Sequence, residues 1–236
     1  MNTEKPATSA KLTPSWGLLP KSIALVREHY VTIMYLMLIP SLILALGSQL
    51  IGTVNEEGAF HSSSTTGIGI ALFIIGAVWS LVNLGPATLF ELQASKNKPL
   101  TLSEYYAKGL PFSFKLYGYY ILYGLLVVGG LILFIVPGII MFRRYALASY
   151  YIVDNGSSVR DAMKQSAKES KTYSGRIWGI FGVQAVFSLG AAALGGIPVI
   201  GVVLSQLIVY LVLMLPVLRY LEIKQASRTA PLKSAA

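Results

Sequence analysis

The sequence predicts an all-α integral membrane protein, a bundle of six transmembrane helices with short interfacial amphipathic helices. Hydrophobic residues make up 54% of the 236 residues, charged residues only 12%, and the mean hydropathy is +0.63. Soluble domains carry about 25% charged residues, and disordered chains are far less apolar. The apolar residues also come in blocks about as long as the ~20-residue helix that crosses a bilayer. A cytosolic enzyme, a secreted enzyme and a disordered adaptor are therefore poor fits.

Six apolar blocks predict the spans. They are residues 31–51, 67–89, 116–136, 139–153, 177–194 and 199–218. Pro40 is expected to kink the first span and Gly85-Pro86 to interrupt the second, because proline lacks the backbone N–H that a helix interior uses. Pro137-Gly138 is a strong turn signal. We therefore expect the chain to turn there, between the third span and a short fourth one.

The flanking segments are polar. Residues 1–20 and 225–236 are predicted to be flexible ends. Residues 21–224 form the predicted six-span membrane domain, which begins with a short amphipathic helix at 20–30. We expect this first helix to lie at the membrane interface.

The distribution of Lys and Arg predicts the orientation. Four segments hold 17 of the 19 Lys and Arg residues, namely 1–30, 94–115, 154–176 and 219–236, and the connections between spans on the other side hold none. Because cytoplasmic loops are enriched in Lys and Arg, both termini are predicted to be cytoplasmic, in a multi-pass protein of the cell inner (cytoplasmic) membrane. The same placement accounts for the net charge of +9, so nucleic-acid binding is not expected.

Two adjacent arginines, Arg143 and Arg144, lie inside the fourth predicted span. An intramembrane charge is costly and suggests a functional site. Gln184 and Gln206 are predicted near the midplane, and an amide oxygen can accept a hydrogen bond from a guanidinium. These four residues form the predicted binding cluster. Two alternatives stay open: the arginines snorkel toward headgroups, or the glutamines only join neighbouring helices.

Residues 157–171 are predicted to form a basic amphipathic helix on the inner membrane surface. Ser158 and Asp161 have the spacing of a capping box, with Asp in place of Glu. Ala, Met and Ser recur on a weakly apolar stripe, which we expect to face lipid unless it packs against residues 101–115. The predicted membrane-surface residues lie on the remaining face and are Arg160, Lys164, Lys168 and Lys171. Membrane lipids, anionic ones above all, are the expected partners.

Several short motifs resemble a recurring bacterial pattern. They are Pro137-Gly138-Ile139, an Arg in the helix that follows, Val153-Asp154-Asn155-Gly156, Ala162, Ser166 and Trp178. On these motifs, residues 20–224 resemble the membrane domain associated with glycerophosphoryl diester phosphodiesterases and related six-helix bacterial membrane families. The resemblance implies a six-helix bundle in the bacterial cytoplasmic membrane without an assigned activity. Some relatives carry an attached phosphodiesterase domain, and no polar region of this sequence is large enough to hold one.

No catalytic constellation is recognisable. The chain has no Cys and two His, both outside the apolar blocks, and it lacks HExxH, GxSxG, P-loop and GxGxxG patterns. We therefore expect no enzyme activity, no cofactor and no metal. The leading hypothesis is a structural, regulatory or lipid-associated membrane protein. The alternative is a small transporter or permease subunit that uses the Arg/Gln cluster, and an intramembrane enzyme acting on lipid ranks third. A homo-oligomer or a partner membrane protein stays open.

Overall fold

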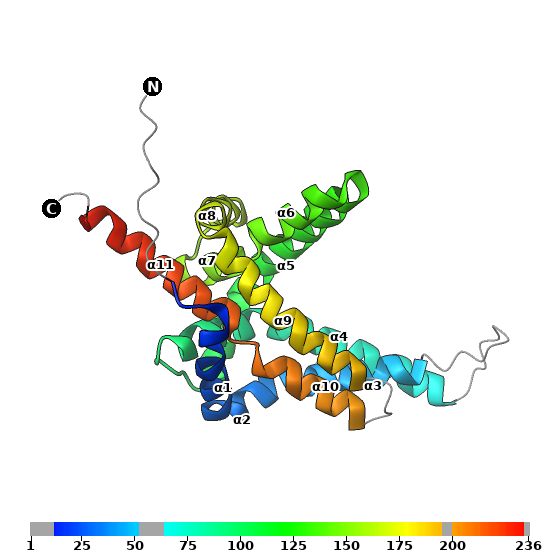
Figure 1. Ribbon diagram of the computed structural model, residues 1–236. Coiled ribbons are helices and arrows are strands. Elements are labelled where there is room, and N and C mark those ends of the chain that lie inside the picture. Colours follow the sequence, from blue (N-terminus) through cyan, green and yellow to red (C-terminus); the bar gives the residue numbers. More distant parts are fainter. Residues whose placement is uncertain (1–11, 52–63, 195–199, 234–236) are drawn as a thin grey trace.

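The computed structural model describes residues 12–51, 64–194 and 200–233, and most of these residues are helical (Figure 1). The helices are η1 Ser15–Leu18, α1 Leu19–Glu28, α2 Tyr30–Ile33, the π-helical turn η2 Met34–Leu38, α3 Ile39–Ile51, α4 Ser64–Ser95, α5 Leu102–Leu133, α6 Ile135–Tyr145, α7 Ala148–Asn155, α8 Val159–Thr172, α9 Ser174–Leu194, α10 Ile200–Leu211 and α11 Leu215–Lys233. No strand occurs in the described residues, which confirms the all-α prediction. The predictions for most of the connection 52–66 and for the turn 195–198 lie outside the described residues.

Five helical stretches in the described part of the chain are long and apolar enough to cross a membrane. They are Tyr30–Ile51, Gly67–Ser95, Leu102–Leu133, Ser174–Leu194 and Val203–Arg228. They correspond to the first, second, third, fifth and sixth predicted spans. The chain is thus a membrane protein with several apolar helices.

The fourth predicted span is divided between two helices. Its residues, 139–153, lie in α6 and α7, on either side of a turn at Ala146 and Leu147. The Tyr119 hydroxyl of α5 donates a hydrogen bond to the Tyr145 carbonyl oxygen at 2.8 Å. Because a carbonyl at the end of a helix needs a partner when it is withdrawn from water, this tyrosine lets the chain change direction. The prediction of one short helix here is wrong.

The turn between α5 and α6 lies at Phe134 and not at Pro137-Gly138, which corrects the prediction. Phe134 has an extended backbone, with φ −158° and ψ 141°. Pro137 stands in the first turn of α6, where its missing N–H would have no helical partner anyway. Gly138 of α6 instead allows a close approach to Gly130 of α5. A Cβ atom on Gly130 would lie only 2.8 Å from the Gly138 Cα. The proline and glycine therefore shape the hairpin without forming its turn.

Gly85-Pro86 does not interrupt the second span, in contrast to the prediction. Helix α4 is continuous through both residues, and its Gly85 backbone N donates to Ser113 Oγ of α5 at 3.1 Å. The two helices cross closely, because a Cβ on Gly85 would lie 2.2 Å from the Gly109 carbonyl oxygen. Such small-residue crossings bring helices together where lipid provides no hydrophobic driving force.

The irregular turn of the first span is η2, which lies just before Pro40. Without an N–H on Pro40, the carbonyl of Leu36 lacks its usual α-helical partner, and the backbone takes a π-helical turn there. Ser41 Oγ donates to the Leu38 carbonyl oxygen at 2.9 Å and lies 3.1 Å from the Tyr210 hydroxyl. The first span is thus joined to α10 at the position where a kink was expected.

Buried and exposed apolar side chains occupy different parts of the molecule. The core lies where the end of α4, the start of α5, α7 and α11 meet, and Phe90, Tyr105 and Tyr151 are fully buried there. The α5–α6 hairpin projects away from this core (Figure 1). At its turn, Ile132 is 80% and Phe134 72% exposed. Soluble proteins rarely expose such a patch, so this hairpin is suited to contact lipid.

Both ends that were predicted to be flexible contain packed residues. In the N-terminal segment, Leu12 and Leu18 are buried in the core. At the other end, α11 continues to Lys233, past residue 225, where the flexible end was predicted to begin. The fully buried Arg219 of α11 donates to Ser15 Oγ at 3.3 Å. This hydrogen bond joins the N-terminal segment to α11. Because the two residues are far apart in the sequence, local sequence patterns could not predict it.

Candidate functional site

Helix α8 is confirmed as a helix, and Ser158 is its N-cap residue. The Asp161 backbone N donates to Ser158 Oγ at 3.2 Å, and Ser158 Oγ donates to the Asp161 carboxylate at 2.6 Å. The serine satisfies one of the N–H groups that a helix start leaves free, and the Asp161 charge suits the positive end of the helix dipole. The capping pattern therefore predicted where this helix begins.

The weakly apolar stripe of α8 packs against protein rather than lipid. Ala162, Met163, Ser166 and Ser170 are all buried, and α8 lies against α6 and α7. Ser166 Oγ donates to the Arg144 carbonyl oxygen of α6 at 2.9 Å. The expectation that this stripe faces lipid is wrong, because small side chains allow α8 to pack closely on its neighbours. The basic residues of the helix stay exposed.

The basic face of α8 lines a hollow of about 460 Å³, here called the α8 hollow, together with the end of α6 and one residue of α5. Its five cationic side chains are Arg144, Arg160, Lys164, Lys168 and Lys171, and its remaining lining is Leu122, Tyr145, Met163 and Ala167. None of the described residues that line it is a carboxylate. The hollow thus places concentrated positive charge beside apolar surface.

Arg144 joins the predicted membrane-surface residues and not the two glutamines. It is exposed, and its guanidinium carbon lies 5.7 Å from the centre of the Tyr145 ring. Arg143 is half-buried, and its Nε has no hydrogen-bond partner among the described residues. Gln184 on α9 and Gln206 on α10 are half-buried. No hydrogen bond links these two to the arginines in the described structure, so the Arg/Gln cluster stays a prediction.

A second basic region, which no sequence pattern predicted, surrounds Asp154 at the end of α7. Lys96, which directly follows α4, and Lys224 of α11 form ion pairs with its two carboxylate oxygens. The Tyr220 hydroxyl donates to Asp154 Oδ2 at 2.7 Å, and the Asp154 side chain is only 7% exposed. These groups are distant in the sequence, so no spacing rule could find them. The one signal was Asp154 itself, within the motif Val153-Asp154-Asn155-Gly156.

The pKa of the Asp154 carboxyl lies below its usual value. Burial alone would raise this pKa, but hydrogen bonds from Lys224, Lys96 and Tyr220 favour the ionised form and outweigh burial. The carboxylate is therefore ionised at neutral pH. It neutralises part of the positive charge that the basic segments bring to this place.

Comparisons of this chain with protein-family models, with curated proteins and with solved structures found no match. Its class therefore rests on its own structure, which is that of an all-helical membrane protein with several apolar helices. Five cations and no carboxylate line the α8 hollow, which makes it the candidate site.

Proposed function

We propose that this chain is a multi-pass protein of the cytoplasmic membrane that binds anionic phospholipid headgroups in the α8 hollow. The observation that carries the proposal is the set of five cations beside apolar side chains, without a carboxylate among them. A basic residue near an anionic membrane surface contributes about 1 kcal/mol. Leu122, an exposed side chain, offers apolar contact to the part of a lipid next to its headgroup. The role is structural or regulatory and not catalytic.

The proposed orientation places the α8 hollow at the inner leaflet. Lys21, Lys96, Asp154 and Lys224 line one pocket, so residues from all four Lys/Arg-rich segments meet in one region. Positive-inside placement assigns that region to the cytoplasm, with α6 and α7 together making the remaining crossing. Reporter fusions at residues 100, 165 and 230 should read cytoplasmic, and a fusion at residue 60 should read external. An external reading at residue 165 would contradict this orientation.

The lipid proposal is tested by native mass spectrometry of the intact protein from mild detergent. Lys164→Gln with Lys168→Gln should lower retention of phosphatidylglycerol relative to phosphatidylcholine by about tenfold or more. The matched control is Arg27→Gln with Lys108→Gln, which removes the same charge from exposed residues outside the hollow. If both double variants lost phosphatidylglycerol equally, the net charge alone would explain the loss. This result would overturn the proposal.

The resemblance to the membrane domain associated with glycerophosphoryl diester phosphodiesterases favours the same proposal. The resemblance implies a membrane domain without an assigned activity of its own, to which a phosphodiesterase domain is attached in some relatives. A lipid-associated, non-catalytic role for this chain agrees with both points.

A further inference from the structure

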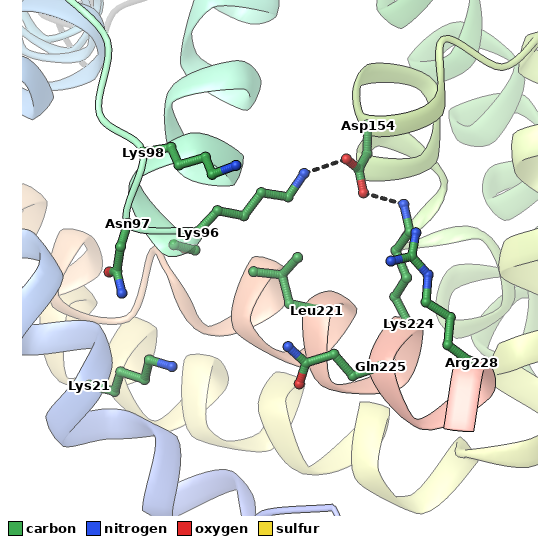
Figure 2. Close-up of a pocket in the computed structure, with 10 residues that line it drawn as sticks. Lys21, Lys96, Asn97, Lys98, Asp154, Leu221, Lys224, Gln225 and Arg228 are labelled. Atoms are coloured by element: carbon green, nitrogen blue, oxygen red, sulfur yellow. Dashed lines mark hydrogen bonds and ion pairs between the residues drawn. The ribbon is translucent and has the colours of Figure 1, made fainter. Parts of the chain in front are cut away.

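The pocket around Asp154 is separate from the α8 hollow and has different walls. It is a hollow of about 500 Å³ between α1, the end of α4 with the residues that follow it, the end of α7, and α11. Figure 2 shows Lys21, Lys96 and Lys98 on one side of it and Lys224 and Arg228 on the other. We call it the Asp154 pocket. Its lining residues are Lys21, Ser95, Lys96, Asn97, Lys98, Asp154, Leu221, Lys224, Gln225 and Arg228.

Positive charge in the Asp154 pocket exceeds its internal negative charge. Five cations line it and Asp154 is the one carboxylate among its lining residues. Asp154 forms ion pairs with Lys96 and Lys224. The other three cations, Lys21, Lys98 and Arg228, form no ion pair with any described residue, and all three are exposed. An anion that entered the pocket would therefore meet cations that no described side chain neutralises.

The lysines that follow α4 are held by a rigid turn. Asn97 has a left-handed backbone, with φ 55°. The backbone N of Lys98 donates to the Gln93 carbonyl oxygen at 3.0 Å, and that of Asn97 donates to Ala94 at 3.0 Å. This pair of bonds is the Schellman arrangement that closes a helix C-terminus. Lys96 and Lys98 are thus placed on either side of a fixed residue, so binding would require little further ordering of the backbone.

Lys224 is held from the opposite wall. Besides Asp154, it donates to Asn155 Oδ1 at 2.7 Å, and its side chain is only 18% exposed. Asp154 is itself fixed by the Tyr220 hydroxyl. The carboxylate therefore keeps two lysines in position at the pocket wall.

We propose that the Asp154 pocket binds a phosphate group that carries two or more negative charges, as in a phosphomonoester or a pyrophosphate. The exposed cations Lys21, Lys98 and Arg228 reach it from separate segments, which suits a tetrahedral oxyanion that accepts hydrogen bonds in several directions. Leu221 is the one apolar side chain of the lining, so the pocket takes the polar part of a ligand. This site is independent of lipid binding in the α8 hollow.

The first test is calorimetric titration of the intact protein in neutral detergent with sodium pyrophosphate. Lys98→Gln and Arg228→Gln should each weaken binding by about tenfold, since each removes a charge-assisted hydrogen bond. Lys168→Gln and Lys171→Gln in the α8 hollow are the matched controls and should leave the affinity unchanged. Absence of saturable binding, or equal weakening by the α8 variants, would overturn the proposal. The α8 variants alone should impair retention of phosphatidylglycerol, a diester, so the two proposals fail separately.

Asp154→Asn gives a second test, with an effect of opposite sign. It frees Lys96 and Lys224 for the ligand, so pyrophosphate should raise the thermal midpoint of this variant more than that of the unmodified protein. If Asp154 only stabilised the fold, pyrophosphate would not raise the thermal midpoint of the variant by this larger amount. An equal or smaller rise in Asp154→Asn would overturn the arrangement proposed for the bound phosphate.

The source of the phosphate group is distinguished in nanodiscs. If a lipid headgroup is the ligand, discs of phosphatidylcholine with phosphatidic acid should block pyrophosphate binding, whereas discs with phosphatidylglycerol, a diester, should not. If the ligand is water-soluble, pyrophosphate should bind equally in all three compositions. Loss of pyrophosphate binding in every disc, phosphatidylcholine alone included, would show that the binding in detergent does not belong to the folded protein in a bilayer.

Discussion

The α8 hollow and the Asp154 pocket each hold five cations, but their cations are held in different ways. In the α8 hollow the four basic residues of α8 are exposed and extend from one helix. In the Asp154 pocket, Lys96 and Lys224 are only 30% and 18% exposed and bind a buried carboxylate. Exposed cations alone suit a fluid anionic surface. In the Asp154 pocket three exposed cations stand beside two fixed ones, and this combination suits a discrete ligand. One carboxylate therefore separates a site for general attraction from a site with defined geometry.

The largest expected difference between the two regions is in stability. Asp154→Asn should lower the free energy of unfolding by about 2 kcal/mol, because two partly buried lysines lose their anionic partner. Lys164→Gln in the α8 hollow should change it by less than about 0.5 kcal/mol, as expected for an exposed side chain. Unfolding by titration with SDS, followed by circular dichroism, measures both. Equal effects of the two substitutions would remove the distinction between the two regions.

The pH dependence of stability is also expected to differ between the two regions. The pKa of Asp154 lies below its usual value in the folded protein, so its stabilising contribution is present above about pH 4. That contribution is lost as the pH falls through the folded-state pKa. The groups that hydrogen-bond to the carboxylate are Lys96, Lys224 and Tyr220.

The measurement is the difference in thermal midpoint between the unmodified protein and Asp154→Asn over the acidic range. The difference should be constant from neutral pH down to about pH 5 and should shrink below about pH 4. Lys164→Gln serves as the control, because it should follow the unmodified protein at every pH. A difference that grows on acidification would contradict the ionised state of Asp154.

Patterns along the chain predicted the apolar helices and helix α8, since both depend on residues close in sequence. Hydropathy located five of the six predicted spans, and the Ser158–Asp161 spacing located the start of α8. The turns were harder to predict. The pair Pro137-Gly138 predicts a turn because proline followed by glycine is a turn signal, but the first turn of a helix tolerates proline.

The candidate sites depended on contacts between distant segments. The spacing of the four basic residues of α8 predicted that they lie on one face. That Arg144 lies in the same hollow could not be predicted, because it depends on the packing of α8 against α6, where Ser166 donates a hydrogen bond. The Asp154 pocket joins segments from near residue 21 to near residue 228. Lysines in several polar segments are also expected from the enrichment of Lys and Arg in cytoplasmic loops. The amino-acid composition of these segments therefore could not show that their lysines meet in one pocket.

A smaller effect tests whether α8 is held by protein contacts. Ser166→Ala should lower the free energy of unfolding by about 1 kcal/mol, because it removes the hydrogen bond to the Arg144 carbonyl oxygen. Ser170→Ala is the matched control on the same helix. Ser170 is equally buried, but its hydroxyl bonds only to Ala167 of α8 itself, at 3.5 Å. If both substitutions have the same effect in SDS titration, the Ser166 bond does not dock α8 on α6.

The smallest expected effect is that of salt on the Asp154 ion pairs. Dissolved ions screen exposed charges strongly and buried pairs much less. The difference in unfolding free energy between the unmodified protein and Asp154→Asn should therefore change by less than about 0.5 kcal/mol between low and high salt. Retention of phosphatidylglycerol by the α8 hollow should fall steeply over the same range, because its cations are exposed. If salt abolished the Asp154 difference as readily as it abolished lipid retention, the two regions would have the same electrostatic character, and the single carboxylate would not distinguish them.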